Sequence, residues 1–405
     1  MNRSRLRGAV RAASPAFFTA LAVLGVYWVL LGHPGWFDWC SLTLYREMWF
    51  GDTWVLLAAS DLRAAGFDPY GPNPLGIVHV YPRVWFGLHD LGLDRGDALW
   101  FGTLIGLLFL GASLWWVRPR TWSEAVVAIG FLISPAFVLG FNRGNNDLII
   151  LLLMMGLCCF LVADSPRIRF MGPVVVLIGA ILKFYPVLAG FALVFGRGHR
   201  RERLWQGLFF AGLCLVLATP LREDYAMAIK GVPQKPGFYG FGAVLSPFSA
   251  LGGLAWTGLL AAAFFGWRTG GGAVDDSTSA LDRAGFVVGA ILTVGCFCAG
   301  VSYLYRLVVI VLILPWLWRC VRIGAKRFWA RAAIWVGLAV VWLDCILILA
   351  TVASLLRHET RWAEIIQAAS GGWRLSLQWL WVGALVYLLA GLCRDLWNRE
   401  WEMRA

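Results

Sequence analysis

Charged residues are scarce in this chain. Of its 405 residues, 14% are Asp, Glu, Lys or Arg, whereas 60% are hydrophobic. A soluble domain needs charge at about a quarter of its residues, so the composition excludes a soluble protein. Apolar runs of about 20 residues, the length that a helix needs to cross hydrocarbon, recur along the chain. The sequence therefore predicts an all-α polytopic membrane protein, with residues 1–405 forming a single integral membrane domain.

Metal-binding and disulfide motifs are also missing. The nine cysteines include no Cys-x-x-Cys pair, and only Cys40 lies in a long polar segment. This pattern excludes a disulfide framework and a thiolate metal site. The five histidines form no His-Glu-x-x-His pattern, and no Asp-x-Asp motif occurs. We therefore expect neither a metal site nor a cofactor.

The net charge of +12 has a pattern along the chain. Basic residues gather on alternate loops, which the positive-inside rule predicts for the cytoplasmic face. The basicity therefore indicates orientation and excludes nucleic acid as a partner. Arg3, Arg5 and Arg7 place the N-terminus inside. The apolar run from Ala12 to Gly32 is too long for the core of a signal peptide, so we predict a retained anchor.

The remaining apolar runs predict about ten full spans with both termini in the cytoplasm. The polar segments between them predict a first outer loop at 33–97 and a second at 221–247. The expected spans are 12–32, 98–117, one ending near 141, 148–163, 204–220, 248–267, 285–302, 307–317, 332–355 and 375–393.

Residues 171–195 do not fit a simple span. Arginines flank the segment on both sides, yet a stretch of this length cannot cross hydrocarbon twice at 1.5 Å per residue. Lys183-Phe-Tyr-Pro186 interrupts it in the middle. We predict two short half-helices that meet there as a re-entrant hairpin, because a broken helix at membrane depth must line a cavity. The alternative is one plain span with an imperfect charge rule.

The first outer loop has its own helical pattern. Between Asp52 and Gly66, apolar residues recur at helical spacing, which predicts an amphipathic helix in the membrane interface. The stripe comprises Trp54, Val55, Ala58, Leu62 and Ala65. The turn-forming sequence FDPYGPNP then ends the helix.

Polar side chains that could carry chemistry collect at the outer ends of the expected spans, and Lys183 lies at depth. A lysine inside an apolar segment is costly, so it needs an anionic partner or a water-filled cavity. A carboxylate above a basic, partly apolar pocket suits an anionic substrate with a lipid tail. The candidate residues are Asp52, Tyr70, Tyr81, Arg143, Asn145, Lys183, Tyr303, Arg306 and His358.

Several of these segments resemble glycosyltransferase family 87, membrane enzymes of the GT-C superfamily that include phosphatidylinositol-mannoside mannosyltransferases. The similar elements are D-x-x-V-x-x-A-A-x-x-L-x-x-A-G-x-D-P-Y at 52–70, YP at 81–82, RGNNDLIILLL at 143–153, LKFYPVL at 182–188 and SYLYRLVVIVLILP at 302–315. Two positions depart from the family pattern. Arg83 stands where the family usually has a second proline, and Asn145-Asn146 replaces its common glutamine.

The resemblance implies a GT-C-like bundle and an inverting transfer of a sugar, such as the hexose mannose, from a polyprenyl phosphate. In that reaction Asp52 would remove the proton of the acceptor hydroxyl as C1 of the donor is attacked. The transition state resembles an oxocarbenium ion. Lys183, Arg306 or Arg143 would stabilise the leaving lipid phosphate. The acceptor would be a glycolipid or a cell-envelope glycan, and the site would face outward from the plasma membrane.

Plainer roles are open for each acidic or basic candidate. Asp52 could cap the interfacial helix, Asp61 could lie on a solvated face, and Asp68 could shape the D-P-Y turn. Asp147 heads an apolar helix and is expected as its N-cap. Lys183 could snorkel or pair with Asp344.

Two other functions are also compatible with such a chain. A transporter or flippase of lipid-linked sugars would share the basic cavity, although we see none of the internal inverted repeats that such proteins carry. A non-catalytic membrane subunit is the other alternative.

Overall fold

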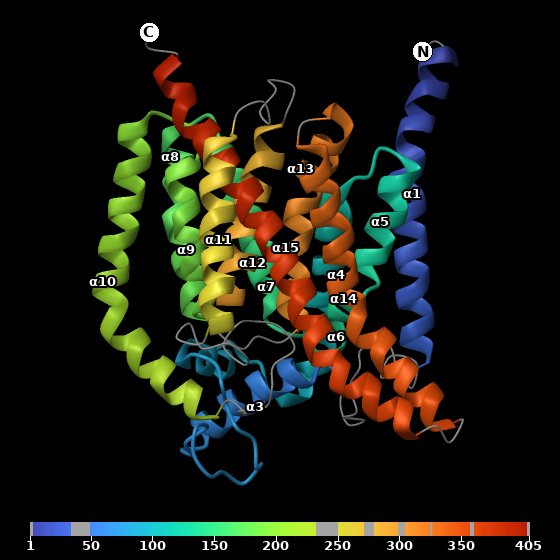
Figure 1. Ribbon diagram of the computed structural model, residues 1–405. Coiled ribbons are helices and arrows are strands. Elements are labelled where there is room, and N and C mark those ends of the chain that lie inside the picture. The colour runs from blue at the N-terminus through green and yellow to red at the C-terminus, as the bar shows by residue number, and fades with distance from the viewer. Residues whose placement is uncertain are drawn as a thin grey trace.

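The computed structural model describes residues 3–33, 49–231, 250–270, 279–298, 304–324, 326–356 and 360–402. Within these ranges every regular element is a helix. Most helices run up and down between two ends of the molecule, and both chain termini lie at the same end (Figure 1). The helices are α1 (Arg3–Gly32), α3 (Gly51–Ala64), η1 (Arg83–Leu91), η2 (Arg95–Asp97), α4 (Ala98–Val117), α5 (Trp122–Leu132), α6 (Pro135–Arg143), α7 (Asp147–Val162), α8 (Pro166–Arg169), α9 (Met171–Leu182), η3 (Tyr185–Phe195), α10 (Arg200–Gly231), α11 (Ala250–Arg268), α12 (Ala280–Cys298), η5 (Leu304–Val309), α13 (Ile310–Ile323), α14 (Arg327–Leu356) and α15 (Thr360–Glu402).

Several of these helices are suited to a bilayer. Four segments of the described chain are long and apolar enough to cross it, namely Ala13–Gly32, Arg95–Val117, Ala280–Cys298 and Leu375–Asn398. Large apolar side chains on them point outward, as Leu21 on α1 and Leu107 on α4 do. Such faces suit a lipid environment. The chain is therefore an all-helical membrane protein, and the expected count of ten spans stays a prediction.

Helices α12 and α13 form the centre of the bundle. Residues of α13 from Ile310 to Leu314 are buried on all sides. The ring centroids of Phe286 on α12 and Trp316 on α13 lie 4.0 Å apart. A Cβ added to Gly285 would lie 2.7 Å from the carbonyl oxygen of Leu312. Glycine on α12 thus permits the close approach of helices that membrane bundles use.

Helices α9 and η3 form a helical hairpin with Lys183 at its turn. The basic segments before and after the hairpin lie next to each other. The Arg169 guanidinium, before the hairpin, donates to both carboxylate oxygens of Glu202, after it, at 2.8 Å each. The backbone N–H of Arg197 also donates to Leu161 O at 2.7 Å. These contacts hold both flanks at one end of the bundle while Lys183 lies toward the other. The chain therefore reverses as expected over 171–195, and the re-entrant placement of this hairpin in a membrane stays a prediction.

The span expected to end near Phe141 is broken in the structure. Helices α5 and α6 meet at an angle of 47°. Ser134 and Pro135 lie at the junction, and Pro135 is the first residue of α6. Proline cannot donate the helical hydrogen bond and its ring crowds the preceding turn. The segment expected as a span ending near Phe141 is therefore bent, which apolarity alone does not reveal, and its crossing of the membrane stays a prediction.

Two helices also extend beyond the apolar segments that were expected as spans. Helix α10 continues through Pro220 to Gly231, so the second outer loop expected at 221–247 begins as helix; residues 232–249 lie outside the described residues. Helix α15 begins at Thr360, where an outer turn was expected. Hydropathy marks where hydrocarbon ends, whereas a helix continues into water because its backbone groups are paired internally.

The helix expected from Asp52 is present as α3, but its buried face differs from the predicted stripe. Ala65 is exposed, whereas Leu56, Leu57 and Ala59 are buried. The reason is that η1 covers α3 from a second side: Ser60 Oγ donates to Phe86 O at 2.6 Å. A helix packed on two sides buries more than one stripe.

Candidate functional site

Helix α3 is attached to the end of the bundle opposite to the termini (Figure 1). The N–H of Phe50 donates to Asn142 O, and Thr53 Oγ1 donates to Gly144 O, both at 2.7 Å. Gly144 has φ +55°, and a Cβ there would lie 2.3 Å from Thr53 Oγ1. Only glycine fits this left-handed position without strain. The end of α6 is thus shaped to receive the start of α3.

Asp52 lies at this junction and is 5% exposed. The Nε atom of Arg143 is 3.0 Å from each of its carboxylate oxygens, and the amide of Asn145 donates to Oδ2. Phe50 is the N-cap residue of α3, and the hydrogen bonds of the Asp52 carboxylate come from Arg143 and Asn145. The capping role is therefore wrong for Asp52, which is instead held by side chains that follow α6.

Lys183 is also buried, and it faces the start of α7. Its Nζ atom lies 3.0 Å from Asp147 Oδ2, 3.0 Å from Asn145 Oδ1 and 2.6 Å from Asn146 Oδ1. The hairpin turn gives Lys183 an extended backbone, which directs it away from α9. A buried ammonium is tolerated only with an anionic partner and further hydrogen bonds. The structure provides that partner as Asp147.

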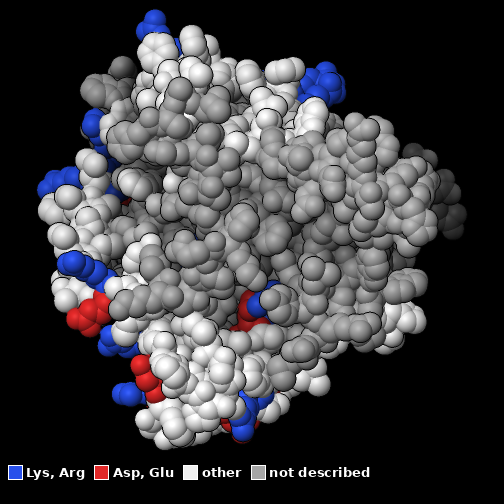
Figure 2. All heavy atoms as spheres, turned by 60° about the horizontal axis from the view of Figure 1, so that its bottom comes forward, with Lys and Arg blue, Asp and Glu red and all other residues white. Residues whose placement is uncertain are grey.

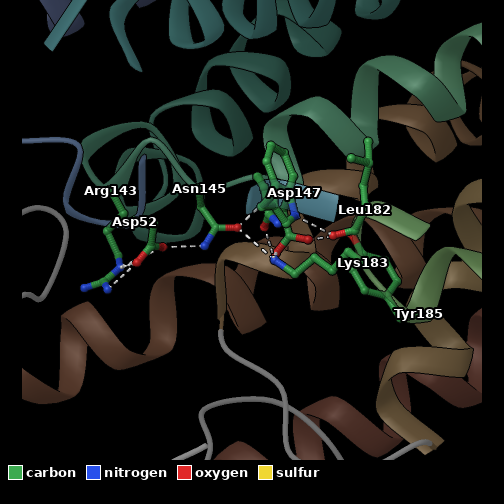
Figure 3. Close-up of polar contacts among 9 residues, drawn as sticks. Asp52, Arg143, Asn145, Asp147, Leu182, Lys183 and Tyr185 are labelled. Atoms are coloured by element: carbon green, nitrogen blue, oxygen red, sulfur yellow. Dashed lines mark hydrogen bonds and ion pairs between the residues drawn. The ribbon is translucent and has the colours of Figure 1, made fainter. Parts of the chain in front are cut away.

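Asn145 connects the two ion pairs (Figure 3). Its amide nitrogen donates to Asp52, and its oxygen accepts from Lys183 and from the backbone N–H of Asp147 at 2.9 Å. We call the connected set the polar network. It consists of Asp52, Arg143, Asn145, Asn146, Asp147, Lys183 and Tyr185. Seen from this end, acidic and basic atoms lie beside each other near the middle of the face (Figure 2).

Tyr185 extends the polar network toward a further cation. Its hydroxyl donates to Asp147 Oδ1 at 2.7 Å, and the guanidinium carbon of Arg306 lies 5.3 Å from its ring centroid. With Arg306, three positive groups stand against two carboxylates in this part of the structure. The region therefore carries an excess positive charge, which favours an anionic ligand.

The two tyrosines of the outer loop lie next to the polar network. Tyr81 is buried, and the Lys183 Nζ atom lies 5.5 Å from its ring centroid. Tyr70 reaches no charged member of the network; its hydroxyl donates to the carbonyl of Tyr81 at 2.7 Å. Trp85 Nε1 donates to Leu182 O at 2.9 Å and thereby attaches η1 to the hairpin. Tyr81 thus joins the site, and Tyr70 positions it.

The structure describes only some of the remaining polar residues that the sequence singled out. Tyr303 and His358 lie outside the described residues, as does the side chain of Asp344. Asp68 shapes its turn, since it accepts from the N–H of Tyr70 at 3.0 Å. Asp61 was expected on a solvated face, but it contacts His89 Nδ1 at 3.1 Å and joins η1 to α3.

Sequence reasoning missed the role of Asp147. It was expected as an N-cap, but Asn146 is the N-cap residue of α7, and the Asp147 carboxylate contacts Lys183 and Tyr185. A signal was available, because an acid at the head of an apolar helix and a lysine inside another apolar segment each need a partner. Nothing in the spacing distinguished Asp147 from Asp344 as that partner.

His79 was also missed. It is fully buried among aromatic rings, 5.2 Å from the centroid of Tyr70, 5.7 Å from Tyr81 and 5.0 Å from Phe86. Burial lowers the pKa of His79 to about 4, since an apolar environment disfavours the charged imidazolium. At neutral pH His79 is an uncharged packing residue beneath the two tyrosines.

An apolar cavity of about 290 Å³ lies beside the tip of the hairpin. It is lined by Ala180, Phe184, Val187, Arg222 and Tyr225. Phe184 directly follows Lys183, so a charged group and an apolar cavity are neighbours here. Among the described residues no three His, Cys, Asp or Glu side chains are grouped so that they could hold a metal ion.

Comparisons of this chain with protein-family models, with curated proteins and with solved structures found no match.

Proposed function

We propose that this chain is an inverting glycosyltransferase that moves a sugar from a polyprenyl-phosphate donor to a glycolipid or cell-envelope glycan. The observation that carries the proposal is the polar network, in which one asparagine separates a buried carboxylate, Asp52, from a buried ammonium, Lys183. The sequence resemblance to glycosyltransferase family 87 supports it, because the network joins three of the four resembling segments that contain charged residues. Mannose is the sugar that the resemblance suggests.

In the proposed reaction Asp52 acts as the general base. The acceptor oxygen forms a bond to C1 of the sugar while the bond from C1 to the phosphate oxygen breaks, and the electron pair leaves with the lipid phosphate. The acceptor proton passes to Asp52. Inversion follows because the acceptor attacks opposite the leaving group.

The resting arrangement of Asp52 leaves little room for an acceptor. A carboxylate has about four lone-pair sites, and contacts from Arg143 and Asn145 occupy both oxygens. One of these donors has to move when the acceptor hydroxyl binds. Arg143 is the mobile candidate, since 37% of its side chain is exposed, whereas Asn145 is fully buried. A displaced Arg143 could then contact the donor phosphate.

Lys183 and Arg306 supply the positive charge that the leaving phosphate requires. The apolar cavity beside Phe184 offers a place for the first part of the lipid tail. A ligand with a charged head and an apolar chain would therefore meet matching surroundings at both of its ends.

The placement in the membrane is part of the same proposal. Both termini lie at the end opposite to α3 (Figure 1), which agrees with cytoplasmic termini and about ten spans. The polar network would then face outward from the plasma membrane, where a lipid-linked donor is reached after it has been flipped.

A transfer assay tests the proposal. Purified protein in detergent is given a polyprenyl phosphate with a labelled sugar, together with an extract of envelope glycolipids. We expect the label to move to the glycolipid with inverted anomeric configuration and free polyprenyl phosphate to accumulate. In liposomes, relocation of the donor without its consumption would favour the flippase and contradict the transferase.

A further inference from the structure

A second cavity lies at the opposite end of the bundle, where the termini are. It measures about 350 Å³ and is bounded by α1, the end of α4, the starts of α5 and α12, and α13. Its volume lies at the lower end of the range of small-molecule sites, about 300–1,000 Å³. The residues that matter below are Arg118, Arg120, Glu124, Asp282, Trp318 and Arg322, all of which line it.

The two acids of this cavity already have arginine partners. Glu124 pairs with Arg322, and Asp282 lies 3.6 Å from Arg319. Among the described residues, Arg118 and Arg120 make no ion pair within 4 Å, and Arg120 acts on Asp282 only over a longer distance. Two positive charges therefore remain at the rim, and arginine is the side chain best suited to bind phosphate with two hydrogen bonds.

The backbone at Arg118 supports a role for its side chain. Arg118 ends α4 in the left-handed region, at φ 37°. Glycine adopts this conformation without strain, whereas a residue with a Cβ does not. Its guanidinium lies 4.3 Å from the ring centroid of Trp115, which fixes its direction. The turn Arg118-Pro119-Arg120 thus holds two arginines at the mouth of the cavity.

A side chain that lines the cavity also has a buried donor without an acceptor. Trp318 is 4% exposed, and its indole N–H has no hydrogen-bond partner within the described part of the chain. Leaving such a group unpaired is unfavourable, so a bound acceptor oxygen would stabilise it.

The surroundings point to a lipid as the source of that oxygen. Trp115 and Trp122 are about half exposed beside the cavity, as tryptophans at a membrane interface are. From Arg118, outward-facing Leu107 and Leu108 lie about 15 Å along α4, and Phe17 and Leu21 face outward on α1. These apolar faces continue from the cavity toward the middle of the bilayer.

We propose that this cavity binds the phosphate of an acidic phospholipid, with Arg118 and Arg120 on the phosphate, Trp318 donating to the headgroup and the acyl chains along α1 and α4. Basic pockets between membrane helices bind such headgroups. The site is separate from the polar network and does not depend on the proposed transferase activity.

Native mass spectrometry of the full chain in detergent tests the site with three probes. These are dioctanoyl phosphatidylglycerol, dioctanoyl phosphatidylcholine and glycerol phosphate, a soluble phosphate monoester without acyl chains. We expect one tightly held phosphatidylglycerol per chain and at least about tenfold weaker binding of the other two. Equal binding of phosphatidylcholine would overturn the assignment to an acidic lipid, and equal binding of glycerol phosphate would identify a free-phosphate site instead.

Two variants locate the lipid. Arg118→Gln with Arg120→Gln should weaken phosphatidylglycerol at least about tenfold, and Trp318→Phe should weaken it about threefold or more. The matched control changes Arg327 and Arg331, two exposed arginines at the start of α14, to glutamine and should bind as the wild type does. Wild-type affinity in the Arg118/Arg120 variant, or the same loss in the control, would overturn the proposal.

Discussion

Two sites at opposite ends of the bundle, the polar network and the Arg118-Pro119-Arg120 turn, hold their basic side chains in different ways. At the α3 end, Asp52, Asp147 and Lys183 are buried, and each contacts a group of opposite charge. At the other end, Arg118 and Arg120 are exposed, and the two nearby acids, Glu124 and Asp282, are paired with other arginines. A buried charge is tolerated only when its partner is in place, whereas an exposed one costs little wherever it lies. The first arrangement therefore demands fixed geometry, and the second leaves room for a ligand.

The largest expected effect follows from removing Lys183. Lys183→Met leaves the buried carboxylate of Asp147 without its cation, which should cost about 3–5 kcal/mol. Unfolding in detergent by SDS titration measures it. The double variant Lys183→Met/Asp147→Asn should recover much of the loss, because no charge is then left alone. Equal destabilisation in the single and double variants would show that the pair is not coupled.

A pH dependence should come from His79 in the outer loop. Its pKa of about 4 in the folded protein lies below the value near 6.5 of an unfolded chain. The unfolded chain therefore binds the proton first, so the stability that His79 supports is present above pH 6.5 and is lost as the pH falls toward 4. The loss should approach roughly 3 kcal/mol. Between pH 7 and pH 5, the unfolding midpoint should change less with pH in His79→Phe than in the wild type. An unchanged pH dependence would show that His79 is not its source.

Gly144→Ala should detach α3 from the bundle. The new methyl group would meet Thr53 Oγ1 at 2.3 Å in a backbone conformation with φ +55°. We expect a cost of about 1–3 kcal/mol, together with faster proteolysis within residues 49–97. Gly111→Ala is the matched control, because nothing lies within 4 Å of its Cβ position. Similar protease resistance in both variants would show that the junction tolerates a side chain.

The smallest effect is expected at the other end. Arg118→Gln with Arg120→Gln should change the lipid-free unfolding free energy by no more than about 0.5 kcal/mol, since both side chains are exposed. The same SDS titration used for Lys183→Met measures it. A loss comparable with that of Lys183→Met would remove the contrast between the two ends.

Some of this architecture followed from the sequence. The helix at Asp52 and the chain reversal at Lys183 were predicted from periodicity and from charges on both flanks of one apolar segment. Those signals are local, and tertiary packing only modifies them. The broken helix at Ser134 and the extension of α10 through Pro220 did not follow. Hydropathy does not distinguish a bent helix from a straight one, and it does not show how far a helix continues beyond its apolar segment.

The partners within the site were harder to predict. Asp52, Arg143, Asn145 and Lys183 were candidates on separate segments, but no sequence spacing indicated that Asn145 would join them. Asp147 was assigned to a cap because an acid at a helix start is common there. Its pairing depends on how the hairpin packs against α7, which is a tertiary contact. The sequence also did not single out Trp318, because only the packing of the helices shows that its side chain lines a cavity.

The central claim is that Asp52 removes the acceptor proton, and one comparison tests it most directly. Sugar transfer from a labelled polyprenyl phosphate is measured for Asp52→Asn and for Asp61→Asn, a control on the same helix, with folding checked by unfolding midpoint. We predict that Asp52→Asn lowers the single-turnover rate at least about 100-fold, while Asp61→Asn stays within a few-fold of the wild type. A near-wild-type rate in folded Asp52→Asn would contradict the claim.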